Sequence, residues 1–162
     1  LANVILQETD EIDPTASLRI ISWGRTLELW KKYPILGIGY NTYRYKAAEE
    51  GIVDENYFSA GGSDSSLLTI LVTTGIVGFT AFLLWYGTLM LTAWRKFWKA
   101  KSKALRSSAS PLLQDSPEIH LGLFSGLCSI LLHSVFVNSL LFPLILIGIM
   151  AVVGSMEERS RA

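Results

Sequence analysis

Residues 65–94 read SSLLTILVTTGIVGFTAFLLWYGTLMLTAW and contain no charged side chain. A helix of this length measures roughly 45 Å at about 1.5 Å per residue, which exceeds the ~30 Å hydrocarbon core of a bilayer. Apolar residues occupy every face of it, whereas a long helix of a soluble protein normally keeps a polar face. The stretch is therefore predicted to cross a membrane, and a buried helix of a soluble protein is the disfavoured alternative.

The residues that follow this helix orient it. The chain continues as RKFWKAKSKALR, with six basic side chains and no acidic one before Asp115. The positive-inside rule then predicts that residues 95–118 form a cytoplasmic basic loop, with Trp94 as an aromatic anchor at the inner interface. Residues 1–64, in which ten acidic side chains face six basic ones, are predicted to be an extracytoplasmic loop.

A second apolar stretch runs from Leu121 to Met156 and is too long for one span. Asn138 and Pro143 interrupt it, which predicts an antiparallel pair of transmembrane helices at residues 119–137 and 140–156. The fold class expected is all-α: a polytopic membrane protein fragment with three transmembrane helices and an extracytoplasmic region that carries an amphipathic helix.

The composition is consistent with this class. Half of the 162 residues are apolar and the formal net charge is zero, so electrostatic function must come from segregated charges. The single cysteine excludes an intrachain disulfide framework and most structural zinc sites. Because no initiator Met and no signal-peptide pattern precede the first polar stretch, residues 1–162 are expected to be one domain from a longer membrane protein whose earlier spans are missing.

The extracytoplasmic loop contains a well-marked helix. Asp13 and Pro14 suit its start and Pro34 stops it, so a helix is expected at residues 14–32. At 100° per residue, Arg19 shares an arc with Trp23, whereas Arg25 falls on a different side. Two interpretations remain open: the helix lies on lipid headgroups, or it forms one wall of a site for a phosphate-bearing lipid.

Residues 33–45, YPILGIGYNTYRY, follow this helix. Gly37 and Gly39 predict a tight turn, since a dinucleotide-binding fingerprint would need a third glycine and a preceding strand. Tyr40 and two further tyrosines, Tyr43 and Tyr45, are expected to form an aromatic surface beside the turn. A short polar helix is predicted at residues 41–50, before a loop that leads to the membrane.

Two ionisable side chains near the membrane helices have alternative roles. Asp64 lies at the start of the first span, either as a helix cap or as a carboxylate able to take a proton from a hydroxyl group. His133 lies in the outer third of the second span, where an ionisable residue is a functional candidate by default. A neutral histidine bonded to a neighbouring helix is the commoner outcome.

Three blocks stand in a fixed order along the chain: Arg19 and Trp23 with the later PILGIGYNTY, then SDSSLLTILVTTGIVG, then HSVFVNSLLFP before a closing apolar span. Together they resemble the C-terminal half of the O-antigen ligase and polymerase superfamily of bacterial membrane glycosyltransferases, over about residues 18–155. That family shows an Arg four residues before a Trp, a Pro-x-x-Gly-x-Gly turn, and a His-Asn pair eleven residues before the first Gly of a Thr-Gly-x-x-Gly helix.

The resemblance implies a multi-pass enzyme of the bacterial inner membrane. It would move a glycan from an undecaprenyl-diphosphate carrier to a lipopolysaccharide core, a further repeat unit or a protein hydroxyl. No metal, cofactor or nucleic acid is expected. Arg19 matches the arginine that holds the diphosphate, Arg25 is a second cation for the same group, and Trp23, Tyr40 and His133 are further candidates for substrate binding.

One position departs from the family pattern. Eleven residues before Gly75 stands Asp64, with Ser65 in place of the asparagine, so the usual histidine base is absent. Asp64 is expected to replace it as general base, although this subgroup could also work without a base there. The rival hypothesis is a non-catalytic membrane protein, a scaffold or transporter fragment, whose basic loop and Trp-rich helix bind anionic lipid.

Overall fold

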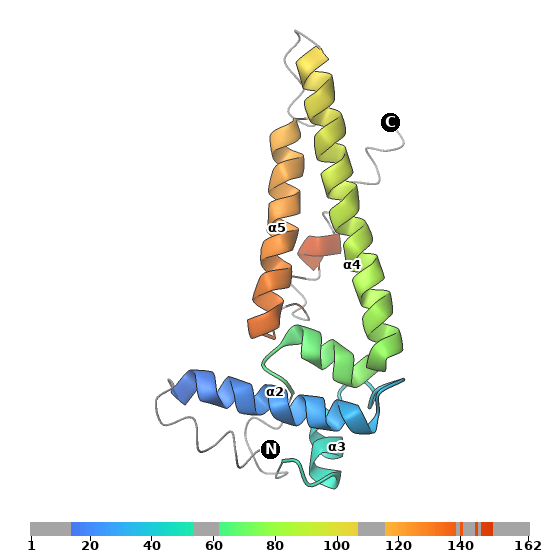
Figure 1. Cartoon of the computed structure of the whole chain (residues 1–162), viewed down its shortest axis with the longest axis vertical. Coiled ribbons are helices and arrows are strands. Elements are labelled where there is room, and N and C mark those ends of the chain that lie inside the picture. The colour runs from blue at the N-terminus through green and yellow to red at the C-terminus, as the bar shows by residue number, and fades with distance from the viewer. Residues whose placement is uncertain are drawn as a thin grey trace. The chain divides into compact units, whose positions relative to one another are not determined.

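The computed structural model describes residues 14–53, 62–106, 116–138, 140, 145 and 147–150. Within these ranges the chain forms helices joined by short turns, and no strand occurs among them. The helices are α2 (Pro14–Lys32), α3 (Tyr43–Glu49), α4 (Ser66–Arg106) and α5 (Pro117–Phe136), as Figure 1 shows. The all-α class expected from the sequence is confirmed.

Helices α2 and α3 form where the sequence predicts them. α2 begins at Pro14 and ends at Lys32, two residues before Pro34, because proline is tolerated in the first turn of a helix and disfavours helical backbone just before it. α2, α3 and the first part of α4 share a small apolar core. Its fully packed members are Leu29, Tyr43, Ala47 and Val72.

Helix α4 is not the straight membrane helix that the sequence predicts for residues 65–94. It breaks at Gly75, whose dihedral angles of φ 65° and ψ −170° are far from helical values. Figure 1 draws α4 with this interruption near its start. The first part, residues 66–74, is therefore separate from the long apolar helix that begins at Ile76.

The second part of α4 also extends further than expected. The helix continues through the basic run to Arg106, where a loop starting at residue 95 was predicted. Ala, Lys, Arg and Leu dominate this run and favour helix, and no Gly or Pro interrupts it. The structure therefore places the basic side chains on a rigid helical extension.

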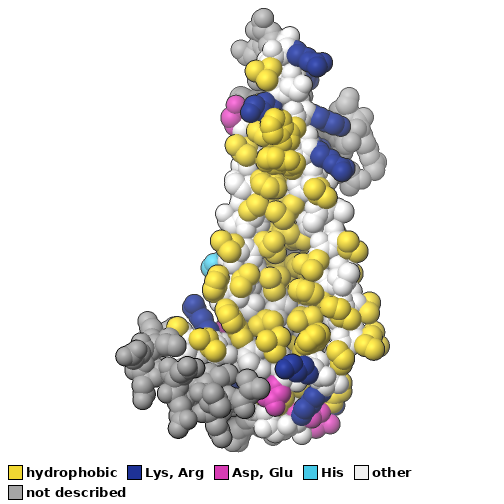
Figure 2. All heavy atoms as spheres, in the orientation of Figure 1, with side chains coloured by type: hydrophobic (Ala, Val, Ile, Leu, Met, Phe, Trp, Pro, Cys, Tyr) yellow, Lys and Arg dark blue, Asp and Glu magenta, His cyan; other side chains and the backbone are white. Residues whose placement is uncertain are grey.

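Two helices in the described part of the chain, α4 and α5, are long and apolar enough to cross a membrane. Figure 2 shows apolar side chains along the long helices and Lys and Arg side chains gathered at the end that carries the basic run. Of the third predicted span, residues 147–150 are helical. Most of its remaining residues lie outside the described ones.

The chain divides into two compact units. The first comprises residues 1–81 and 134–139, and the second comprises residues 82–133 and 140–162. In the second unit, the Tyr86 hydroxyl donates a 2.7 Å hydrogen bond to the Leu127 carbonyl. An apolar cavity in this unit is lined by Gly122, Leu123, Gly126, Leu127, Ile130, Ile145, Gly148 and Ile149. The candidate site residues lie mainly in the first unit.

Candidate functional site

The inner face of α2 is fixed by a buried pair of hydroxyl groups. Thr26 Oγ1 donates a 2.8 Å hydrogen bond to the Ser22 carbonyl and shares a second bond, of 3.0 Å, with the Tyr43 hydroxyl. Thr26 is 1 % exposed and Tyr43 5 % exposed. The prediction that Tyr43 belongs to an aromatic surface is therefore wrong, because this ring is part of the core that joins α3 to α2.

Two charged side chains shift the pKa of the Tyr43 hydroxyl in opposite directions. Burial raises the pKa of this hydroxyl, the hydrogen bond with Thr26 and the Arg25 guanidinium lower it, and the Asp64 carboxylate raises it. Arg25 and Asp64 are thus both within electrostatic range of one buried hydroxyl. This relation was not visible in the sequence, where the two residues are far apart.

Ser65, and not Asp64, caps α4. The Leu68 amide donates to Ser65 Oγ at 3.4 Å, which is the bond from the third helical residue that a capping side chain accepts. Asp64 precedes the cap and is exposed. The capping interpretation of Asp64 is therefore wrong, and its carboxylate lies just outside the positive end of the helix dipole.

Asp64 is held against α2 by its backbone. Its amide donates a 3.4 Å hydrogen bond to Ser22 Oγ. Arg19 and Ser22 are three residues apart on α2 and share one side of that helix, about one turn apart. The half-buried Arg19 therefore belongs to the same face of α2 that contacts the Asp64 segment.

A second contact ties this region to the end of α5. Ser65 Oγ donates to the Ser134 carbonyl at 3.2 Å, and Ser66 Oγ donates to the Val137 carbonyl at 3.0 Å and to Asn138 Oδ1 at 3.3 Å. The last carbonyls of a helix have no amide partner inside it. The hydroxyl groups of Ser65 and Ser66 therefore donate hydrogen bonds that the backbone at the end of α5 cannot provide itself.

Trp23 extends the same assembly. Its ring lies 6.0 Å from the Phe136 ring, centroid to centroid, and its indole N–H is buried without a hydrogen-bond partner among the described residues. A buried donor of this kind costs about 1–3 kcal/mol while it stays unpaired. The Trp23 ring therefore packs against the end of α5, and its indole N–H is covered by protein.

The two remaining candidates, Tyr40 and His133, are exposed side chains. Tyr40 is 86 % exposed, beyond the turn at Gly39. His133 is exposed on α5 and belongs to the second unit. A role for either residue in substrate binding stays a prediction.

The two glycine motifs of the sequence meet in the structure. Gly37 and Gly75 both have positive φ, and their backbones are in direct contact. A Cβ on Gly37 would lie 2.5 Å from the Gly75 amide nitrogen, and a Cβ on Gly75 would collide with the Ile35 carbonyl. The Pro-x-x-Gly-x-Gly turn and the Thr-Gly-x-x-Gly helix thus form one structural feature.

Several residues of the site were not identified from the sequence. Ser22 was unremarked because an isolated serine in an amphipathic helix gives no periodic signal, and Asn138 was used only as a break between spans. Ser65 was noted for its place in the family pattern, but not as the cap. What unites these residues is tertiary contact, which sequence spacing within one helix cannot report.

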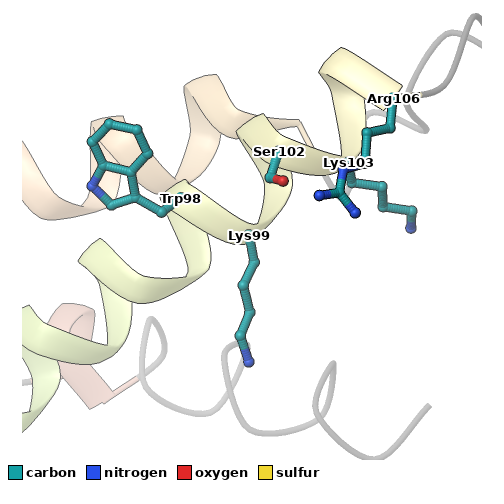
Figure 3. Close-up of a pocket in the computed structure, with 5 residues that line it drawn as sticks. All are labelled: Trp98, Lys99, Ser102, Lys103 and Arg106. Carbon is teal, nitrogen blue, oxygen red and sulfur yellow. The ribbon is translucent and has the colours of Figure 1, made fainter.

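The basic end of α4 forms a separate open groove. It is lined by Trp98, Lys99, Ser102, Lys103 and Arg106, and Figure 3 shows Lys99 extending away from the Lys103 and Arg106 side chains. Lys101 lies over the Trp98 ring at 5.1 Å. Cations spread along a helix beside aromatic rings are typical of contact with anionic lipid headgroups.

These features define the class: an all-helical membrane protein with a polar, arginine-bearing region at the start of its long apolar helix. A family model described as O-antigen ligase matches residues 1–83, which nearly coincide with the first segment of the first unit. The chain belongs to the O-antigen ligase family. No curated protein and no solved structure matches the chain. The family consists of membrane proteins and implies a glycosyltransferase of ligase or polymerase type.

Proposed function

We propose that the chain is the C-terminal part of a bacterial inner-membrane glycosyltransferase that transfers a glycan from an undecaprenyl-diphosphate carrier to an acceptor hydroxyl. The observation that carries the proposal is the hydrogen bond from the Asp64 amide to Ser22 Oγ, because it joins the carboxylate segment to the α2 face of Arg19. The family match supports the reaction class. Lipopolysaccharide core, a growing glycan and a protein hydroxyl all remain possible acceptors.

Asp64 and Arg19 have different roles in the proposed reaction. The acceptor oxygen attacks the anomeric carbon of the donor sugar as the bond from that carbon to the diphosphate oxygen breaks. Asp64 takes the proton of the acceptor hydroxyl, and the departing diphosphate gains negative charge. Arg19 donates parallel hydrogen bonds to that diphosphate, which a planar guanidinium does without a metal ion.

Other residues complete the proposed site. Arg25, on the other flank of α2, supplies a second cation for the diphosphate. Trp23, Tyr40 and His133 are proposed to contact the glycan or the carrier. The side chain of Thr26 positions this face of α2 through Tyr43.

The experiment is Arg19→Lys in the full-length membrane protein. Lysine keeps the charge but loses the planar pair of donors, so we expect glycan transfer to fall by about 10²–10³, the range seen when one donor to a developing anion is removed. Transfer is measured in membranes with a lipid-linked glycan donor, and expression and thermal stability are measured in parallel.

The basic groove on α4 favours a second candidate, a non-catalytic protein that binds anionic lipid. In such a protein Arg19 contacts only headgroups, so Lys would serve as well as Arg. Normal transfer by a well-expressed Arg19→Lys variant would remove Arg19 from the mechanism. Lys31→Gln, an exposed change on the same helix, is the matched control and should leave transfer unchanged.

A further inference from the structure

The turn after α2 forms backbone hydrogen bonds with α4 at the point where that helix is interrupted. In an unbroken helix, the amides of Ile76 and Val77 would donate to the carbonyls four residues earlier, at Val72 and Thr73. Instead, the Ile76 amide donates to the Pro34 carbonyl at 2.9 Å and the Val77 amide to the Ile35 carbonyl at 3.4 Å. The helix amides freed by the break thus find partners in the turn.

The carbonyls freed by the break are satisfied in the same way. The Ile38 amide donates to the Val72 carbonyl at 3.0 Å, and the Gly39 amide donates to the Thr73 carbonyl at 2.9 Å. Four hydrogen bonds between the turn and α4 therefore replace two bonds within the helix. Pro34 also has no backbone N–H that would need a partner. The positive φ of Gly37 and the absence of a Cβ there permit this close approach.

The side chains around this junction are apolar and uncovered. Ile35 is 63 % and Leu36 75 % exposed in the turn, and Ile76 is 46 % and Val77 56 % exposed in the adjoining helix. Single exposed apolar residues are ordinary, but a contiguous group of four joined by backbone bonds marks a surface that contacts something apolar.

The depth of the junction identifies that partner. From Ile76 to Trp94 the helix measures roughly 28 Å at about 1.5 Å per residue, which matches the ~30 Å hydrocarbon core. With Trp94 at one interface, Ile76 and Val77 lie at the opposite edge of the hydrocarbon. Irregular backbone is tolerated at such a depth where its polar groups are paired, and the Pro34 and Ile35 carbonyls and the Ile38 and Gly39 amides of this turn are paired with α4.

We propose that the Pro34–Gly39 turn is a membrane-inserted element, with the Ile35 and Leu36 side chains among lipid acyl chains beside Ile76 and Val77. The sequence alone assigned this turn to the extracytoplasmic loop. Because α2 ends two residues before Pro34, insertion of the turn fixes the position of α2 along the membrane normal. The arginines of α2 are then held close to the level of the lipid headgroups. The proposal does not depend on the enzymatic function.

The test measures the depth of single spin labels in the full-length protein, reconstituted in phosphatidylcholine–phosphatidylglycerol vesicles after Cys128→Ala. Labels are placed through Leu36→Cys and, as a second position in the turn, Ile35→Cys. Val77→Cys serves as the lipid reference and Tyr45→Cys, 68 % exposed on α3, as the matched water reference. Collision with oxygen, which dissolves in lipid, is compared with collision with a water-soluble nickel chelate.

We expect the labels at Leu36 and Ile35 to shift toward oxygen, as Val77 does, and the label at Tyr45 to favour the nickel chelate. If a variant at one turn position fails to fold, the other position reports the same depth. If the labels at the turn collided with the nickel chelate as often as the label at Tyr45 does, the proposal would be overturned. The turn would then lie in water outside the membrane.

Discussion

The Ser65 hydroxyl accepts a hydrogen bond from the Leu68 amide at the start of α4, so the Asp64 carboxylate does not cap this helix. Asp64→Asn therefore removes only the charge and the basicity of this side chain. We expect glycan transfer to fall by roughly 10²–10⁴, the range for loss of a general base, while the free energy of unfolding falls only by the attraction of this charge to the helix dipole, about 0.3–1 kcal/mol. Transfer assays and unfolding curves of the purified variant measure the two effects.

Ser65→Ala is the control for a purely structural role at this helix start. It removes the cap and the bond to the Ser134 carbonyl, so it should lower the free energy of unfolding by about 1 kcal/mol or more. If Asp64→Asn lost stability to the same extent while transfer per folded molecule stayed normal, Asp64 would be a structural residue, and transfer would depend chiefly on diphosphate departure.

Gly37 and Gly75 meet backbone to backbone, so neither position has room for a methyl group. Gly37→Ala and Gly75→Ala should each lower the free energy of unfolding by at least about 1–3 kcal/mol, the strain of an L-residue at such a dihedral angle, before any steric clash is added. Thermal unfolding in detergent measures the loss.

Gly24→Ala is the matched glycine control in the same unit. Gly24 lies within α2, and a Cβ there would meet no atom within 4 Å. Because alanine favours helix over glycine by about 1 kcal/mol, this variant should unfold at the same temperature as wild type or higher. Equal stability of Gly37→Ala and Gly24→Ala would show that the turn and the α4 break do not need their close contact.

At the scale of elements, a surface clamp joins the ends of α2 and α3. Glu50 accepts hydrogen bonds from Lys32 Nζ at 2.6 Å and from the Tyr33 hydroxyl at 2.7 Å. These bonds lower the pKa of Glu50 below its ordinary value of 4.5, and the Glu50 bond raises the pKa of Lys32 above 10.5. The clamp is complete only while both groups are charged.

The sign of the pH dependence follows from these directions. A carboxyl group with a lowered pKa stabilises the fold above pH 4.5, and this contribution is lost as the pH falls through its folded-state pKa. Glu50→Gln, which keeps an acceptor oxygen but no charge, should therefore unfold at a lower temperature than wild type at pH 7. The difference should shrink below pH 4.5.

Glu49→Gln is the control, since Glu49 pairs with Lys46 inside α3 and not with α2. Thermal unfolding of both variants at pH 7 and at pH 4 distinguishes the clamp from general surface charge. A Glu50→Gln difference that stayed constant between these pH values would contradict the electrostatic origin of the clamp.

The elements themselves differ in how far the sequence determines them. The ends of α2 were predictable because Pro14 and Pro34 act locally, and α3 followed from its position between a turn and a loop. The break at Gly75 was not, because a glycine inside an apolar run is compatible with straight helix. Its determinant is a turn far away in the chain, at Pro34–Gly39, whose backbone takes over the helical bonds.

The candidate site also contains residues that could be predicted from the sequence and residues that could not. Arg19 and Asp64 were identified because their positions relative to Trp23 and to the glycine motif match the pattern of the O-antigen ligase family. Ser22, which joins their segments, was not, because its role is a contact with a residue 42 positions further along. Periodicity reports which residues share a helix face, whereas the contact between faces arises only on folding.

At the scale of the whole molecule, the family match and the compact first unit cover nearly the same N-terminal residues. The shared residues hold Arg19, Asp64 and the glycine junction. The second unit carries the longer apolar helices and the basic extension of α4. We therefore expect the first unit to hold most of the residues that act on substrate, and the second to contribute most of the apolar surface that lies in the membrane.

Orientation in the membrane is the last prediction, and it decides on which side the proposed transfer occurs. Six basic residues follow the apolar part of α4, so this end should face the cytoplasm. After Cys128→Ala, a cysteine at Ser102 should react with an impermeant maleimide only in permeabilised cells, and one at Gly62 should react in intact cells. Because α4 stays helical to Arg106, Ser102 lies about 12 Å beyond Trp94, in water. Labelling of Ser102→Cys from outside would reverse the topology and place Arg19 and Asp64 on the cytoplasmic side.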